Sequence, residues 1–359
     1  MIPYWIMFFI PSLVALEARP IARYNVDGTR RVAIKPIWIF AVIITIALIG
    51  FRFEVGGDWF TYAGYLERGR FLSFADLFYQ ADPGYVALNI VAARLGVGMT
   101  GVNIASAMIF TAGLVVFLQT LPRPWLGLSC AIPYLVIVVA MGYTRQSVAL
   151  GFVMLGLVAL RRQRVKTFIL WVILGALFHK TAVLLLPIGA MISTRARIQH
   201  IGLVGLAAFA AYDAFLARHA EQLIDVYIVE QLTSSQGAFV RLFMNAVPAA
   251  LMLFFGRNLA MTPTDRKIWR LFSWIALFML GAFFTTGFST ALDRMALYLI
   301  PLQLVLFSHL PDALGVRNRR NTTFVFLIVF YYALVQFVWL NFAAHAPYWL
   351  PYQMGFSLN

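Results

Sequence analysis

The run TFILWVILGALFHKTAVLLLPIGAMI, residues 167–192, determines how the rest of this chain can be threaded through a membrane. Only His179 and Lys180, near its middle, are ionisable. A spanning helix needs about 20 apolar residues, so the run is long enough for one crossing. Ionisable groups at membrane depth are costly, however, and they tend to mark functional sites. Because the His–Lys pair interrupts the run, a second possibility is a hairpin that enters from the cytoplasmic side and bends at these two residues.

Composition places the whole chain in the membrane. Hydrophobic residues make up 62% and charged residues 12%, whereas a soluble domain has about half and about a quarter. No stretch has the composition of a soluble domain. We therefore predict an all-α polytopic membrane protein, with residues 1–359 forming a single integral membrane domain.

Apolar runs predict about ten transmembrane helices in addition to the re-entrant hairpin. They lie at about 2–17, 36–51, 101–120, 125–142, 146–160, 199–217, 240–256, 268–286, 291–309 and 322–341. Two further segments are predicted to be loops at the outer face. Residues 52–97 form the first, in which 83–97 is a short re-entrant or amphipathic helix. Residues 218–239 form the second, with apolar positions at helical spacing.

The distribution of charge supports this threading. With a hairpin at 167–192, 19 of the 28 Lys and Arg residues fall on the inner side, with only four of the 14 acids. Basic residues concentrate in cytoplasmic loops, so the net charge of +14 reflects membrane topology rather than nucleic-acid binding. A single crossing at 167–192 would move the basic cluster at 257–270 outside. The one cysteine, Cys130, permits neither a disulfide nor a cysteine metal site within the chain.

Five short polar motifs map to the outer side in this topology. They are RFEVGGDWFTY (52–62), ADPGYVAL (81–88), GYTRQSVAL (142–150), LFHKTAV (177–183) and TALDRMALY (290–298). Each has a structural interpretation: an interfacial turn with an Arg–Asp pair, a helix cap, a polar link between spans, a hydrogen-bonded histidine and a second helix cap. Together they also describe a site for an anionic, partly lipidic substrate. Arginines suit phosphate or diphosphate, and carboxylates or histidine can deprotonate a hydroxyl.

In this order and approximate spacing, the motifs from about residue 36 to residue 300 resemble the EpsG family of Wzy-like bacterial exopolysaccharide polymerases. Asp82 departs from the family pattern, which more often has Glu before Pro-Gly. The resemblance implies a multi-pass protein of the bacterial plasma membrane, related to the GT-C glycosyltransferases, with its active site facing the periplasm or the outside. Its substrate would be undecaprenyl-diphosphate-linked oligosaccharide, joined without a metal or other cofactor. A flippase and a chain-length regulator are the implied partners, besides membrane lipid.

The motifs give two sets of candidate site residues. The candidate catalytic residues are Asp58, His179 and Arg145. The candidate substrate-binding residues are Arg52, Glu54, Tyr62, Tyr85, Gln146, Lys180, Arg294 and Tyr298. The three arginines would bind the diphosphate, and either Asp58 or His179 would activate the acceptor hydroxyl.

Three other functions are compatible with the same residues. A single-sugar glycosyltransferase would yield a discrete product rather than a ladder of chain lengths. An O-acyltransferase would use His179 and require access to an acyl donor. A transporter of lipid-linked oligosaccharides would usually show repeated halves, and the sequence shows none.

Overall fold

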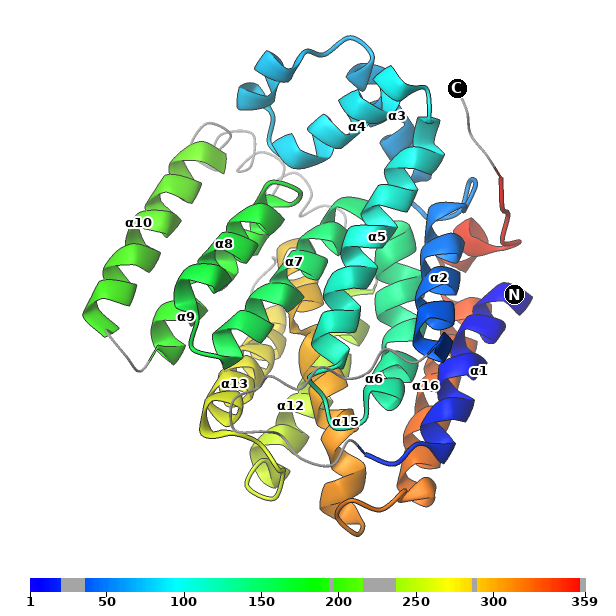
Figure 1. Ribbon diagram of the computed structural model, residues 1–359, viewed down its shortest axis with the longest axis vertical. Coiled ribbons are helices and arrows are strands. Elements are labelled where there is room, and N and C mark those ends of the chain that lie inside the picture. Colours follow the sequence, from blue (N-terminus) through cyan, green and yellow to red (C-terminus); the bar gives the residue numbers. More distant parts are fainter. Residues whose placement is uncertain (21–35, 194–196, 216–236, 286–288, 356–359) are drawn as a thin grey trace.

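The computed structural model describes residues 1–20, 36–193, 197–215, 237–285 and 289–355, and within these ranges the regular structure is helical. Figure 1 shows the helices packed side by side in a bundle, with shorter pieces over one end. In chain order the elements are α1 (Ile2–Glu17), α2 (Pro36–Gly50), α3 (Trp59–Gly69), η1 (Phe74–Tyr79), α4 (Pro83–Leu95), α5 (Gly98–Leu118), α6 (Pro124–Ala131), η2 (Ile132–Ala140), α7 (Thr144–Arg161), α8 (Val165–Ala176), η3 (Lys180–Leu185), α9 (Leu186–Ile192), α10 (Arg197–Phe215), α12 (Ala238–Phe255), α13 (Pro263–Thr285), α14 (Ser289–Ala296), η6 (Leu297–Leu299), α15 (Ile300–Leu314), α16 (Thr322–Phe342) and η7 (Ala346–Trp349).

Within the described ranges, five helices are long and apolar enough to cross a membrane, judged by length and composition. They are Gly98–Leu118, Ala238–Phe255, Pro263–Thr285, Ser289–Leu314 and Thr322–Phe342. Six shorter apolar helices accompany them. The protein is thus an all-helical, multi-pass membrane protein, as predicted. Each predicted span overlaps a helix or consecutive helical pieces, whereas the predicted loop at 218–239 lies outside the described residues apart from 237–239.

The continuous pair α6–η2 lies in the centre of the bundle. Every residue from Pro124 to Ala140 is buried, in a run that is almost entirely apolar. A helix that is apolar all round is one that is buried on every side. The η2 part has the wide turns of a π-helix, a geometry that often occurs at functional sites.

Two glycines bring α5 and α7 into close contact. A Cβ added at Gly113 would lie 2.1 Å from the carbonyl oxygen of Gly151, and one added at Gly151 would lie 2.9 Å from the Cα of Phe110. Small residues at helix crossings let the two backbones approach in membrane proteins. This crossing fixes the position of α7, which begins at the polar motif around Arg145.

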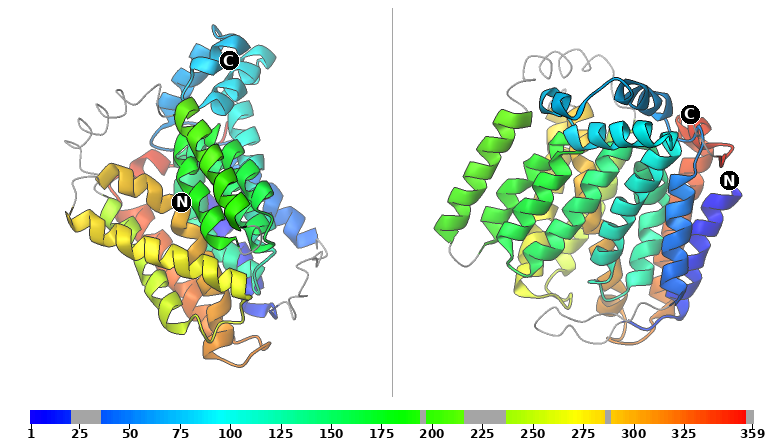
Figure 2. Two further views of the ribbon diagram at one scale, coloured as in Figure 1. Left: turned by 90° about the vertical axis from the view of Figure 1, so that its left-hand side faces the viewer. Right: turned by 45° about the horizontal axis from the view of Figure 1, so that its top comes forward.

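Residues 167–192 form two helical arms, α8 and η3–α9, which pack against each other on either side of a bend at Leu177–His179. The bend lies beside the start of α4, because the backbone N–H of Gly84 donates to the carbonyl of Leu177 at 2.8 Å. His179 and Lys180 are therefore brought to the end of the bundle that α3 and α4 cover. Figure 2 shows α4 lying across the ends of the bundle helices there.

Ion pairs tie the helices together at the opposite end. Arg161 donates to both carboxylate oxygens of Asp265, at 2.5 and 2.9 Å. Arg123 donates to Asp312 at 2.7 Å and also to two backbone carbonyls, those of Arg319 and Arg320. Bidentate and multiply bonded arginines of this kind hold segments in a fixed geometry. All these residues belong to segments that the sequence assigns to the inner side.

The α5–α7 crossing can be tested by adding one methyl group. We expect Gly113→Ala to push the helices apart and to cost about 1–3 kcal/mol, the usual effect of overpacking, measured as a lower midpoint of thermal unfolding in detergent. Gly281→Ala in α13 is the matched control, because no heavy atom lies within 4 Å of its added Cβ. An unchanged midpoint for Gly113→Ala would contradict the close approach.

Candidate functional site

A glycine turn between α2 and α3 positions the first candidate, Asp58. Gly56 has φ of +112°, which favours glycine, and a Cβ there would lie 2.4 Å from the carbonyl oxygen of Met141. The turn is thus pressed against the end of η2. Asp58 follows it, directly before α3, and its side chain is half-buried.

The second motif meets the third in a buried ion pair. Arg145, at the start of α7, donates to Asp82 at 2.6 Å, and the Asp82 side chain is 6% exposed. Asp82 also accepts the backbone N–H of Lys180 at 3.2 Å. The guanidinium of Arg145 lies 5.0 Å above the ring of Tyr65 and interacts with Tyr62. One carboxylate therefore joins the start of α4, the start of α7 and the bend of the hairpin.

The hairpin bend also contacts the fifth motif. The Nδ1 of His179 lies 2.6 Å from the hydroxyl oxygen of Thr181, which in turn donates to the hydroxyl of Tyr298 at 3.2 Å. His179 and Tyr298 are both buried, at 7% and 2% exposed. This chain of hydrogen bonds brings residues 179 and 298 into one cluster.

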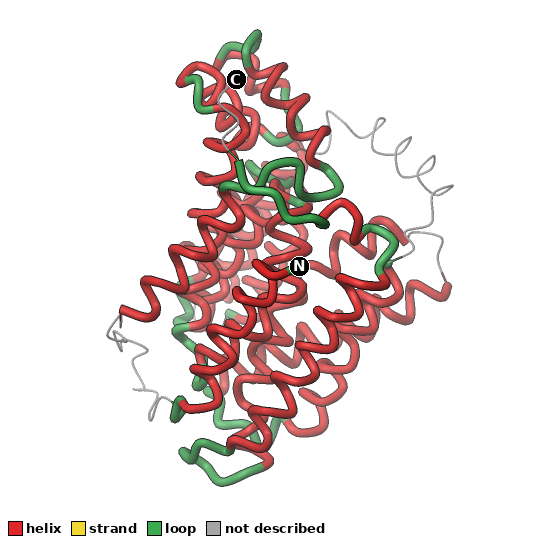
Figure 3. The backbone as a smooth tube through the Cα atoms, turned by 90° about the vertical axis from the view of Figure 1, so that its right-hand side faces the viewer, coloured by secondary structure: helices red, strands yellow, loops and turns green. Residues whose placement is uncertain are grey.

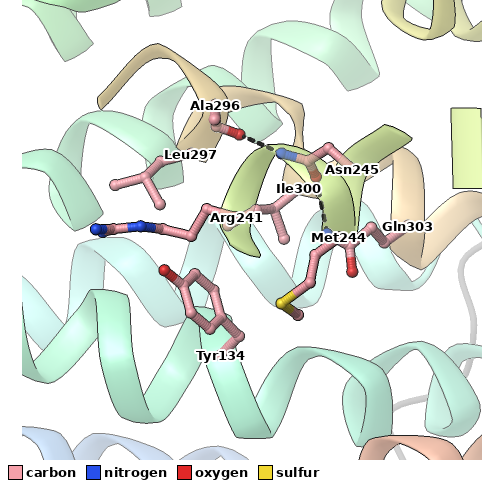
Figure 4. Close-up of a pocket in the computed structure, with 8 residues that line it drawn as sticks. All are labelled: Tyr134, Arg241, Met244, Asn245, Ala296, Leu297, Ile300 and Gln303. Carbon is pink, nitrogen blue, oxygen red and sulfur yellow. Dashed lines mark hydrogen bonds between the residues drawn. The ribbon is translucent and has the colours of Figure 1, made fainter. Parts of the chain in front are cut away.

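The broken helix α14–η6–α15 presents Arg294, and side chains from two other helices hold it in place. Gln146 of α7 donates to the carbonyl of Arg294 at 2.6 Å, and Asn245 of α12 donates to that of Ala296 at 2.8 Å. Arg241 of α12 pairs with Asp293. Figure 4 shows Arg241, Asn245 and Ala296 around a narrow pocket at this junction. The side-chain amide of Gln146, which was predicted to bind substrate, thus donates to a backbone carbonyl instead.

Charges from all these segments act on one another. Burial raises the pKa of Asp58, and the positive charges of Arg294, Arg145 and His345 act in the opposite direction. Burial lowers the pKa of His179, at the hairpin bend, and the nearby cations Arg145, Arg294 and Lys180 lower it further. The neutral imidazole is therefore strongly favoured. Asp58 and His179 respond to the same two arginines, which places them in one electrostatic environment.

Two cations of this cluster have no carboxylate partner. Across the described ranges, no Asp or Glu oxygen lies within 4.0 Å of the Arg294 or Lys180 side-chain nitrogens. Arg294 is exposed and Lys180 is half-buried. Cations without a direct ion pair form a suitable environment for an anionic ligand. Within the same ranges, no group of three His, Cys, Asp or Glu side chains could hold a metal ion.

Three predicted binding residues have other environments than the substrate-facing ones expected for them. Arg52 is 1% exposed, and it donates to the carbonyl of Ile49 at 2.5 Å and to the hydroxyl of Thr144 at 2.9 Å. Its guanidinium therefore links the end of α2 to the start of α7. Tyr85 is fully buried and packs edge-on against Tyr62. Glu54 is exposed, with φ of +52°.

Residues of this region that are in neither candidate set include Tyr65, Asp82, Thr181, Arg241 and His345. Asp82 and Thr181 already lie within two of the motifs, and Tyr65 lies one helical turn after Tyr62, so it could have been found by extending the first motif. Arg241 lies in a span that otherwise looks apolar, and its partner Asp293 is far away in sequence. His345 belongs to no motif.

The fold and this cluster define a helical membrane protein with a polar site at one end of its bundle. Residues 35–354 match the family model of the EpsG family, and the chain therefore belongs to the EpsG family. Membership suggests a membrane protein of the polysaccharide polymerase type. Searches of the curated proteins and of the solved structures returned no significant match.

The Asp82–Arg145 pair should matter for stability as well as for the site. We expect Asp82→Asn to leave a largely buried guanidinium without its counter-ion and to cost about 3 kcal/mol, seen as a lower unfolding midpoint. The control is Glu17→Gln, which breaks the exposed Glu17–Arg320 pair, for which about 0–1 kcal/mol is usual. Equal midpoints for the two variants would mean that Asp82 does not hold Arg145.

Proposed function

We propose that the protein is a glycosyltransferase that polymerises undecaprenyl-diphosphate-linked repeat units at the outer face of the bacterial plasma membrane. The observation that supports this most directly is that, within the described part of the chain, Arg294 and Lys180 form no ion pair with a carboxylate, while Arg294 acts on the half-buried Asp58. Family membership and the all-helical membrane fold agree with it. We further propose that about ten helices span the bilayer in a GT-C-like arrangement.

Arg294 and Lys180 would act on the donor. In the reaction, the acceptor hydroxyl oxygen forms a bond to the anomeric carbon, and the bond from that carbon to the diphosphate oxygen breaks. The lipid diphosphate leaves with the electron pair and gains negative charge as it does so. Fixed cations stabilise that developing charge more than they stabilise the intact donor, which lowers the barrier.

Asp58 is the better candidate for the base that takes the acceptor proton. Burial raises its pKa, which makes the carboxylate a stronger base than an exposed one. Protonating His179 would instead place a new positive charge beside Arg145, Arg294 and Lys180. We therefore assign His179 a positioning role, through its contact with Thr181 and onward to Tyr298.

The aromatic surface beside Arg145 would bind the sugar. Tyr65 is half-buried and lies under the guanidinium of Arg145, while Tyr62 packs against it at 6.5 Å between ring centroids. Aromatic faces offer an apolar surface to the C–H groups of a sugar ring, and a phenol hydroxyl can hydrogen-bond to its hydroxyls. In this proposal Arg145 positions the aromatic surface, because its guanidinium is bonded to Asp82 and lies over Tyr65. Binding the diphosphate is then not its sole role.

The donor assignment predicts a large and specific effect of Arg294. With purified protein in nanodiscs and lipid-diphosphate-linked repeat units, the wild type should give a ladder of products on a gel. We expect Arg294→Ala to slow it by about 10²–10³-fold, the usual loss for one group that stabilises transition-state charge, and Arg294→Lys to retain more activity. Arg70→Ala is the control, because Arg70 is exposed directly after the end of α3 and pairs with Glu67.

Other products would point to other functions. A single discrete addition would identify a single-sugar transferase, and acyl transfer to the glycan would identify an O-acyltransferase. Movement of the lipid-linked unit across a sealed vesicle without any new product would identify a transporter. Each of these results would remove the polymerase assignment.

The base assignment predicts how the rate depends on pH. Because the carboxylate of Asp58 must be unprotonated to accept a proton, the rate should rise with pH through the pKa of Asp58, which lies above the ordinary value for aspartate. Asp58→Asn should abolish polymerisation and Asp58→Glu should shift this acidic limb. Asp76→Asn, on the exposed η1 turn, is the control. If Asp58→Asn keeps the activity and the limb, another group is the base.

A further inference from the structure

The last described segment of the chain, residues 343–355, lies against the glycine turn that carries Asp58. We call these residues the C-terminal tail. Figure 1 shows it, in red, beside the covered end of α2, and Figure 3 shows loops gathered at that end of the bundle. Three backbone hydrogen bonds join the two segments: Gly56 N–H to Tyr348 O at 2.9 Å, Phe53 N–H to Gln353 O at 3.1 Å, and Gly355 N–H to Phe51 O at 3.0 Å.

Trp349 anchors the tail to the centre of the bundle. Its side chain is 3% exposed, and its indole N–H donates to the carbonyl of Ile137 in η2 at 2.8 Å. Its own carbonyl accepts the hydroxyl of Tyr4 at 2.8 Å. A Cβ at Gly142 would lie 2.6 Å from the indole ring, so the fit there is tight. The tail is therefore held in one position by bonds to α1, η2 and the turn.

This position brings His345 to the site. The N–H of Tyr348 donates to the carbonyl of His345 at 3.1 Å, closing a short turn whose other end is bonded to Gly56. Asp58 is two residues beyond Gly56, and His345 is one of the groups that lower the pKa of its carboxyl. The His345 side chain is exposed and stacks on Tyr348 at 6.1 Å between ring centroids. An exposed imidazole has two ring nitrogens that can hydrogen-bond to a ligand.

We propose that the C-terminal tail supplies His345 to the site as a residue that binds the acceptor sugar next to Asp58. Its imidazole would hydrogen-bond to the acceptor unit while Asp58 takes the proton of the attacking hydroxyl. The match to the EpsG family runs to residue 354 and so includes the tail. The role as acceptor ligand rests on the proposed function, whereas the role in binding lipid-linked sugar does not.

The groups that act on Asp58 determine how its pKa should respond when one of them is removed. Arg294 comes from α14, Arg145 from α7 and His345 from the tail, and Tyr62 of α3 also interacts with Asp58. Removing His345 takes away one of the three groups that lower the pKa of Asp58. A role confined to folding would leave the pH dependence of the reaction unchanged, so a shift in that dependence separates the two roles.

We expect His345→Ala to raise the KM for lipid-linked repeat unit by about five- to tenfold, as for the loss of one hydrogen bond. The acidic limb of the pH–rate profile should move to higher pH, because Asp58 loses a neighbour that lowers its pKa. His345→Gln should recover part of the KM, since its amide still hydrogen-bonds. Gln353→Ala is the control on the same tail, because its side chain is exposed and the backbone bond to Phe53 remains.

Direct binding separates this inference from the proposed function. Affinity for the same lipid-linked repeat unit is measured on purified, monodisperse protein, for the wild type and for His345→Ala and Gln353→Ala. If the wild type binds but makes no ladder, and His345→Ala binds more weakly, the polymerase assignment falls and the role of His345 stands. If the wild type makes the ladder and His345→Ala keeps the wild-type KM, affinity and pH profile, the role of His345 is overturned.

Discussion

The buried carboxylate of Asp82 is the constraint around which the polar end of the bundle is arranged. It accepts hydrogen bonds from the Arg145 guanidinium and from the backbone of Lys180. Three segments from distant parts of the sequence thereby share one partner. A buried charge is tolerated only when it is paired and hydrogen-bonded, so the hairpin bend, the start of α4 and the start of α7 stay together. The aromatic surface under Arg145 and the imidazole of His179 take their positions from this arrangement.

The same arrangement leaves Arg294 and Lys180 without a direct ion pair in the described part of the chain. Asp82 is committed to Arg145, and Asp293 is committed to Arg241, next in sequence to Arg294. Asp58, the remaining carboxylate near them, is half-buried and feels Arg294 and Arg145 without a direct ion pair to either. Positive charge is thus left in excess where an anionic lipid diphosphate would bind. These three acids therefore have three different environments.

Much of the fold could be predicted from the sequence because lipid imposes simple rules. Long apolar runs must be helical to satisfy their backbone groups, so the predicted spans overlap the helices. The meeting of Asp58, Arg145, His179 and Arg294 also followed from placing all ionisable motifs on one side. The burial of Arg52 did not, since it depends on the carbonyl of Ile49 and the hydroxyl of Thr144 reaching the same guanidinium. The sequence also did not predict that Asp82 pairs with Arg145 or that His345 lies near Asp58, because both depend on contacts between distant segments.

The C-terminal tail has a consequence for how the protein comes into being. The polar cluster draws on segments from the glycine turn at residues 51–58 to the tail at 343–355. During synthesis the earlier helices can insert and pack while the last segment is still inside the ribosome. The turn that carries Asp58 then lacks its hydrogen bonds to Tyr348 and Gln353 until translation of the tail is finished. A nascent chain in the membrane would therefore hold an unfinished site until the tail has been made and has reached the turn.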